Sequence, residues 1–198
     1  MPHTEKREMQ VACQQVLLPD ASVYSVQWID LPASVSARVT WSLLLEHYFR
    51  VIRNRTLGLV RPTVTTDGVR FRLLGTRLAL LAFRPARFEV DQGGESVHLR
   101  ICGGILVQAG ECDRGMFSLA AAPCDQGVRV TVQLSDYCPL LLGSRTPSGL
   151  RRFLYGSTQS YIHKVVTVGY LSSLCLKLTG ARPRAGVVKV QVRDGRDI

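Results

Sequence analysis

An alternation of apolar and polar residues with a period of two runs through the middle of the chain. In residues 69–73 the apolar side chains alternate with Arg70 and Arg72, and the same alternation returns in residues 96–102 and 128–134. Because successive side chains of a β-strand point to opposite faces, each segment predicts a half-buried strand. Runs of β-branched, aromatic and other apolar residues predict more strands at 11–18, 23–29, 78–83, 88–90, 105–107 and 116–121.

Short connections join the strands of this middle region. Turn residues stand at 65–68, 91–94 and 123–127, whereas a parallel pair of strands needs a crossover of about a dozen residues or more. The strands from 69 to 134 therefore predict an antiparallel meander. Residues 56–62 show no such period, which predicts an irregular connection. A last strand is predicted at 187–192.

Two segments show the wider spacing that is typical of helices. The first, residues 41–52, places these apolar residues on one face: Trp41, Leu44, Leu45, Tyr48, Val51 and Ile52. Ser34 or Ser36 is predicted to cap its start. The second, residues 150–178, is predicted as a long helix that the sheet must stabilise, because its glycines and valines favour a helix only weakly. A helical wheel predicts that these residues share its covered side: Leu150, Leu154, Tyr161, Val165, Val168 and Cys175.

Together these elements predict an α+β fold. An antiparallel meander sheet wraps on the long C-terminal helix, with one shorter helix near the N-terminus. The chain has 198 residues, which suits a single domain over residues 10–198 behind a flexible N-terminus of residues 1–9.

Charge adds a candidate interaction surface. The net charge is +10, and residues 38–88 hold ten arginines opposed only by Glu46 and Asp67. This excess is explained either by a general preference for arginine, since the chain has 21 arginines and 4 lysines, or by an anionic partner such as nucleic acid or membrane headgroups. On the second interpretation the anion-binding residues are Arg70, Arg72 and Arg129, which project outward from predicted strands.

The cysteines and the N-terminus predict a cytoplasmic protein. None of the six cysteines forms a C-x-x-C pair, so no zinc ribbon or other metal site is predicted, and the charged N-terminus lacks a signal-peptide pattern. Free, mostly buried thiols are expected in a reducing compartment. No apolar run reaches the ~20 residues of a transmembrane helix.

The order of the elements resembles the START-type, helix-grip (SRPBCC-like) superfamily. The resemblance lies in the helix at 41–52, the strands between 69 and 134, and the helix at 150–178. It implies a curved sheet that grips the long helix around an internal apolar cavity. The strands at the N-terminus and at 187–192 depart from that pattern.

Catalytic signatures are missing from the sequence, and no catalytic residue or cofactor is predicted. The favoured function is non-catalytic binding of an apolar or amphipathic, lipid-like small molecule between the sheet and the C-terminal helix. The predicted ligand-binding residues are Phe71, Phe88, Leu99, Leu154, Tyr161, Val165 and Val168. The alternatives are the anionic partner described above and an assembly subunit that uses the apolar residues 139–142 as an interface.

Overall fold

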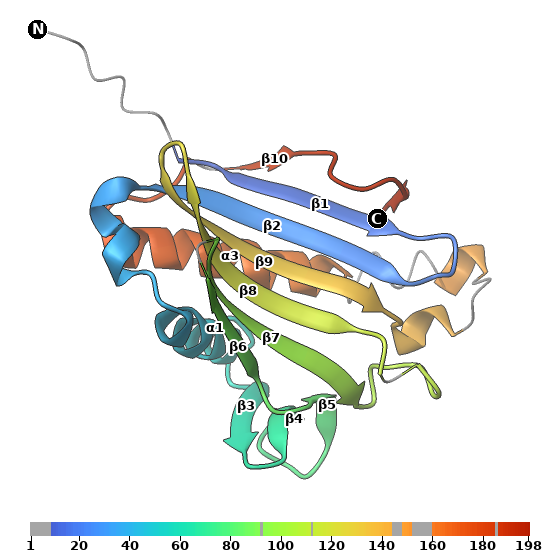
Figure 1. The fold of residues 1–198 in the computed structure, drawn as a ribbon. Coiled ribbons are helices and arrows are strands. Elements are labelled where there is room, and N and C mark those ends of the chain that lie inside the picture. Colours follow the sequence, from blue (N-terminus) through green and yellow to red (C-terminus); the bar gives the residue numbers. More distant parts are fainter. Residues whose placement is uncertain (1–8, 92, 112, 144–147, 152–159, 185) are drawn as a thin grey trace, which may run out of the picture.

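The computed structural model describes residues 9–91, 93–111, 113–143, 148–151, 160–184 and 186–198. They form an α+β fold in which one large curved sheet packs against the helices α1, Trp41–Arg55, and α3, Tyr161–Thr179, as the sequence predicts (Figure 1). Short 3-10 helices occur at Ala33–Arg38 and Leu140–Leu142. The division into a flexible N-terminus and a single domain stays a prediction, although Met9 already packs against the core.

The sheet joins strands that are neighbours in sequence with strands that lie far apart in the chain. Its spatial order is β10 (Val187–Lys189), β1 (Val11–Leu17), β2 (Val23–Pro32), β9 (Gly127–Tyr137), β8 (Met116–Cys124), β7 (Gly94–Gly103), β5 (Ala79–Phe83), β4 (Gly68–Leu73) and β3 (Val60–Thr65). In addition, β6 (Arg87–Asp91) pairs with β7, and β11 (Arg196–Asp197) pairs with β1. Of these pairs only β1 with β10 is parallel, so the predicted antiparallel meander is confirmed.

Alternation along the strands produces the core. In β9 every second residue from Val128 to Leu134 is buried, and the residues between them are half-buried on the other face. The apolar faces of β7, β8, β9 and β2 join one cluster with the buried residues of α1 and α3. Both helices therefore lie against the same face of the sheet (Figure 1).

The predicted apolar face of α1 is confirmed, but its cap is not. Leu44, Tyr48, Val51 and Ile52 are buried, and the side chain of Thr40, not of Ser34 or Ser36, accepts a hydrogen bond from the backbone N–H of Leu43. Residues 33–38 form a 3-10 helix and Val39 is extended, so the α-helix starts later than the serines allow.

The covered side of α3 differs from the predicted one. Tyr161 and Val165 are 62% and 40% exposed, and the buried side is made of other residues: Val166, Thr167, Gly169, Tyr170, Leu171, Leu174, Cys175 and Leu178. Of the predicted set only Cys175 is buried, while Leu154 lies outside the described residues. Apolar residues surround most of this helix, so their spacing does not select the side that meets the sheet. Gly169 marks a close approach, because a Cβ atom there would stand 2.9 Å from Cζ of Arg55.

Two local predictions were wrong. The connection predicted at 56–62 already contains the start of β3 at Val60, which pairs with Leu73. Residues 105–107 form a turn that ends in an isolated bridge to Pro139, not a strand. In both cases pairing with another segment decides the outcome. The strand predicted at 88–90 is confirmed as β6, which pairs with β7 and is exposed along its whole length.

Candidate apolar cavity

An apolar cavity of about 140 Å³ lies between the sheet, α1 and the first turns of α3. All layers of the fold contribute to its wall: Tyr48, Ile52, Thr56, Val60, Phe71, Leu80, Leu81, Phe83, Ile101, Leu106, Phe117, Leu134, Tyr137, Ile162, His163 and Val166. The wall therefore joins segments from the first helix to the last. Its shape depends on the complete fold.

Packed aromatic rings fix much of the wall. The ring of Tyr48 stacks on Phe117 at a centroid distance of 4.7 Å and meets Tyr170 edge-on at 5.2 Å. On the other side the rings of Phe71 and Phe83 pack edge-to-face at 5.0 Å. Such pairs hold rings in defined orientations, so the cavity is formed before any ligand enters.

His163, one of the residues of this wall, has a buried ring nitrogen. Although the residue as a whole is partly exposed, its Nε2 atom is buried and has no hydrogen-bond partner among the described residues. Burial lowers the pKa of His163 to about 4, so the imidazole is neutral at pH 7. The nearby hydroxyl of Tyr137 is already used, since it donates to the carbonyl oxygen of Leu106 at 2.7 Å. A ligand with a hydroxyl or similar group would give His163 Nε2 the partner it lacks.

The volume limits what fits inside. An apolar protein cavity of about 150 Å³ holds one benzene molecule, whereas pockets for larger ligands measure roughly 300–1,000 Å³. The cavity of this protein, at about 140 Å³, thus has room for a single ring. A long acyl chain would need a larger space.

The structure places the predicted ligand-binding residues in different environments. Phe71 lines the cavity, and Leu99 is fully buried in the core beside Phe117, its partner across the β7–β8 pair. Phe88 is exposed and packs on Trp41 at a centroid distance of 4.1 Å. Val168 is partly buried against the core, and Tyr161 and Val165 are exposed as described above. The binding role of these residues stays a prediction.

Sequence reasoning missed the helix residues that do face the cavity. Ile162, His163 and Val166 line it, and none of them belongs to the covered side that the helical wheel predicts. Tyr161 and Val165, which the wheel places on the covered side, each precede a residue of the wall by one position. Because residues 165 and 166 are both valines, the sequence does not show which of them faces the sheet.

The predicted anion-binding arginines do not form one group. Arg129 makes a bidentate ion pair with Asp30, with distances of 2.6 and 2.8 Å, and lies over the ring of Trp28. Arg70 and Arg72 lie on β4, four strands away, or about 19 Å at the usual strand spacing. Arg72 directly faces Arg61 across the β3–β4 pair. Anion binding by these residues stays a prediction.

His98 lies on the outer face of the sheet, as its alternation with Val97 and Leu99 predicts. Its ring nitrogens contact the hydroxyls of Ser96 at 2.9 Å and Ser118 at 2.8 Å. Tyr161 lies on α3, which packs against the opposite face. The described residues also contain no group of His, Cys, Asp and Glu that would hold a metal ion, and no helix long and apolar enough to cross a membrane.

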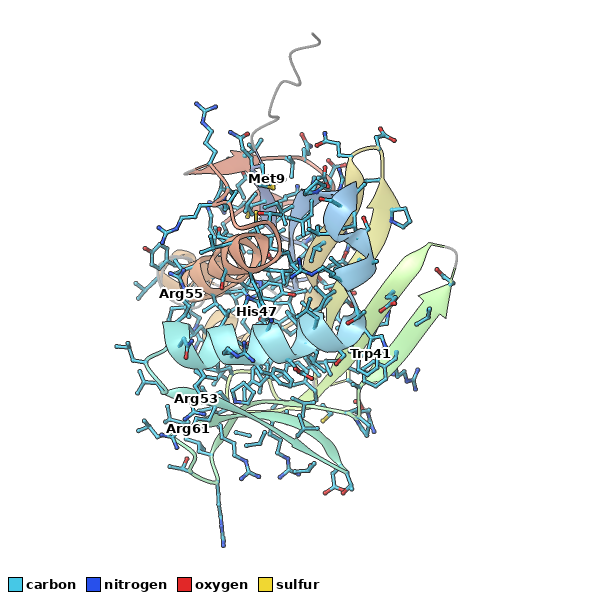
Figure 2. All side chains as sticks on the ribbon, turned by 90° about the vertical axis from the view of Figure 1, so that its left-hand side faces the viewer. Met9, Trp41, His47, Arg53, Arg55 and Arg61 are labelled. Carbon is cyan, nitrogen blue, oxygen red and sulfur yellow. The ribbon has the colours of Figure 1, made fainter. Side chains whose placement is uncertain are left out.

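A second buried histidine joins the two helices. His47 extends from α1, where Figure 2 labels it, and its Nε2 lies 3.2 Å from the hydroxyl of Ser173 on α3. Its Nδ1 is buried without a hydrogen-bond partner in the described part of the chain. Burial, with smaller contributions from Lys177 and Arg50, lowers the pKa of His47 to about 4. The fold therefore holds this side chain neutral.

Acidification is expected to destabilise the fold through His47 and His163. Both have a folded-state pKa of about 4 against an ordinary value of 6.5, so the unfolded chain binds more protons between these limits. The free energy of unfolding should fall as the pH drops from about 6.5 to about 4. Urea unfolding at several pH values across this range measures the free energy of unfolding. His47→Asn should reduce the slope of this free energy against pH. An unchanged slope in the variant would contradict the role of His47.

Comparison with known proteins gives a distant structural match. No family model and no curated protein matches the chain. The crystal structure of CalU16 from Micromonospora echinospora matches over 88% of this chain and 92% of that chain, with 13% sequence identity and a TM-score of 0.32. A likeness this distant supports no argument about family or ligand, and the resemblance to the START-type superfamily stays a prediction.

Proposed function

We propose that the protein binds a small apolar molecule, about one ring in size and with one polar substituent, in the cavity beneath α1 and α3. The observation that supports this most is the combination of a preformed apolar wall with one buried nitrogen, Nε2 of His163, that has no hydrogen-bond partner among the described residues. Ligand sites are commonly apolar hollows in which a few polar groups set the orientation. The ring fills the apolar space and its substituent bonds to His163.

This proposal narrows the lipid-like ligand that the sequence suggests. The volume of about 140 Å³ is too small to enclose a long chain, and the neutral state of His163 disfavours an ionised substituent. A phenol or a cyclic alcohol satisfies both conditions. Its hydroxyl serves either tautomer of the imidazole, because it both donates and accepts.

Phenol and toluene have nearly the same shape, and only phenol carries a hydroxyl. Comparing them therefore separates the polar from the apolar contribution to binding affinity. Both are expected to bind the wild-type protein in a calorimetric titration. His163→Leu should weaken phenol about tenfold or more, since it leaves a buried hydroxyl without a partner, and should leave toluene unchanged or tighter. If neither compound binds the wild type, the proposed function is wrong. An equal effect of the variant on both compounds would exclude the role of His163.

A further inference from the structure

Exposed leucines gather at one end of the small β3–β4–β5 region. They are Leu57, Leu59, Leu74 and Leu78, here called the leucine tip. Leu57 and Leu59 follow α1, and the others belong to the turn between β4 and β5. The backbone N–H of Leu74 donates to the carbonyl oxygen of Leu59 at 2.7 Å, so the two segments are in contact.

The backbone of the leucine tip is unfavourable for the residues it contains. Leu57 and Leu74 adopt φ angles of 52° and 51°, a left-handed conformation that glycine and asparagine adopt more readily. Their side chains are 90% and 54% exposed, so core packing does not account for them. A strained apolar residue that points into solvent suggests a role outside the fold.

Three arginines adjoin the leucine tip. The carbonyl oxygen of Arg53 accepts from the backbone N–H of Gly58, and Nε of Arg61 donates to the carbonyl oxygen of Gly58 at 3.2 Å. Figure 2 labels both arginines, which lie at the same end of the molecule. Arg77 stands in the turn with Leu74 and Leu78. No ion pair joins these arginines to a carboxylate in the part of the chain that the structure describes.

The nearest acidic residue in sequence lies far from this end. Asp67 is the only acidic residue from 47 to 88, and it stands in the turn at the opposite end of β3 and β4. The length of these strands separates it from the tip by roughly 17–20 Å. The tip therefore presents aliphatic side chains within a positively charged rim.

We propose that the leucine tip docks on the surface of an anionic lipid bilayer. The leucines enter the boundary between headgroups and acyl chains, while Arg53, Arg61 and Arg77 contact the headgroup phosphates; apolar burial and attraction to anionic lipids are the two contributions to such binding. Nucleic acid fits less well, because single strands are bound by stacking on aromatic rings and the tip has none. The proposal does not depend on a ligand in the cavity, although Thr56 and Val60 of the cavity wall adjoin Leu57 and Leu59.

Flotation with vesicles tests the proposal. The vesicles contain either phosphatidylcholine alone or phosphatidylcholine and phosphatidylserine in equal amounts. The leucine variant is Leu57→Asn with Leu74→Asn, in which asparagine suits the left-handed backbone and should keep the fold. The arginine variant is Arg53→Gln with Arg77→Gln. The control is Val90→Asn, an equally exposed apolar position beside the start of α1, about 20 Å from the tip along that helix.

The wild type and Val90→Asn are expected to float with the anionic vesicles. With vesicles of phosphatidylcholine alone, both proteins should remain in the bottom fraction. The leucine variant should lose at least tenfold in partition coefficient, and the arginine variant about fivefold for each arginine. Equal binding to both kinds of vesicle, or full binding by the leucine variant, would overturn the proposal. The proposal would also be wrong if the wild type were a dimer and the leucine variant a monomer, which would make the tip a dimer interface. Binding of a single-stranded RNA without binding of vesicles would overturn it as well.

Discussion

Tyr170→Ala is expected to lower the free energy of unfolding by about 3–5 kcal/mol, the usual cost of removing a large buried aromatic side chain. Tyr170 is fully buried on α3, where its ring contacts those of His47 and Tyr48 on α1. Its hydroxyl lies 3.3 Å from the carbonyl oxygen of Leu44, to which it donates. The substitution removes the central contact between the two helices and leaves a cavity that rigid elements cannot close.

Denaturant unfolding of Tyr170→Ala and of Tyr161→Ala provides a matched comparison on the same helix. Tyr161 is exposed, so its removal should change the free energy of unfolding by no more than about 0.5 kcal/mol. If both variants lost a similar free energy of unfolding, the buried side of α3 would be assigned wrongly. The side of α3 that is buried is where the structure departs most from the helical wheel.

Val166→Phe is expected to abolish toluene binding while the protein stays folded. Val166 lines the cavity, and a phenyl ring has about the size of the benzene that a cavity of this volume holds. Because the new ring enters existing space, the substitution should cost less than the ~1–3 kcal/mol of overpacking a filled core. Affinity should fall by a factor of about 100 or more, as measured by calorimetry.

Val165→Phe is the control for this substitution. The neighbouring side chain is 40% exposed and does not line the cavity, so the same change in volume should leave toluene affinity within about twofold. Retained toluene binding in Val166→Phe would show that toluene binds elsewhere. Loss of binding in both variants would point to a disturbance of α3 and not to filling of the cavity.

Local periodicity predicted most of the sheet and the inner face of α1. The alternation in β4, β7 and β9 reports directly which side chains face the core, because a strand has only two faces. The pairing of β2 with β9 could not be predicted in this way, because it joins residues about a hundred positions apart and local periodicity does not report which strands pair. The same is true of β10, whose parallel pairing with β1 places the end of the chain beside its beginning.

The cavity could be predicted only in outline. The resemblance in the order of the elements implies an apolar space next to the long helix, which stays a prediction. The alternation along β4 predicts that Phe71 faces the core, where it is buried. The remaining wall depends on the rotation of α3, which its nearly uniform apolar surface does not specify. His163 is the clearest example, because a polar residue of a helix is normally expected to face solvent. Here the side chain lines the cavity, and one of its ring nitrogens is buried.

Methyl-resolved NMR of the wild-type protein titrated with toluene tests the central claim, that the cavity is a ligand site. Toluene bound in the cavity should shift only methyl groups of the wall, such as those of Val60, Ile101 and Val166, and none at Leu57 or Leu74 of the exposed tip. Ring currents of the ligand act over a short range, so the pattern of shifts locates the ligand. Shifts at the tip alone, or no shifts at saturating toluene, would show that the cavity is not a ligand site.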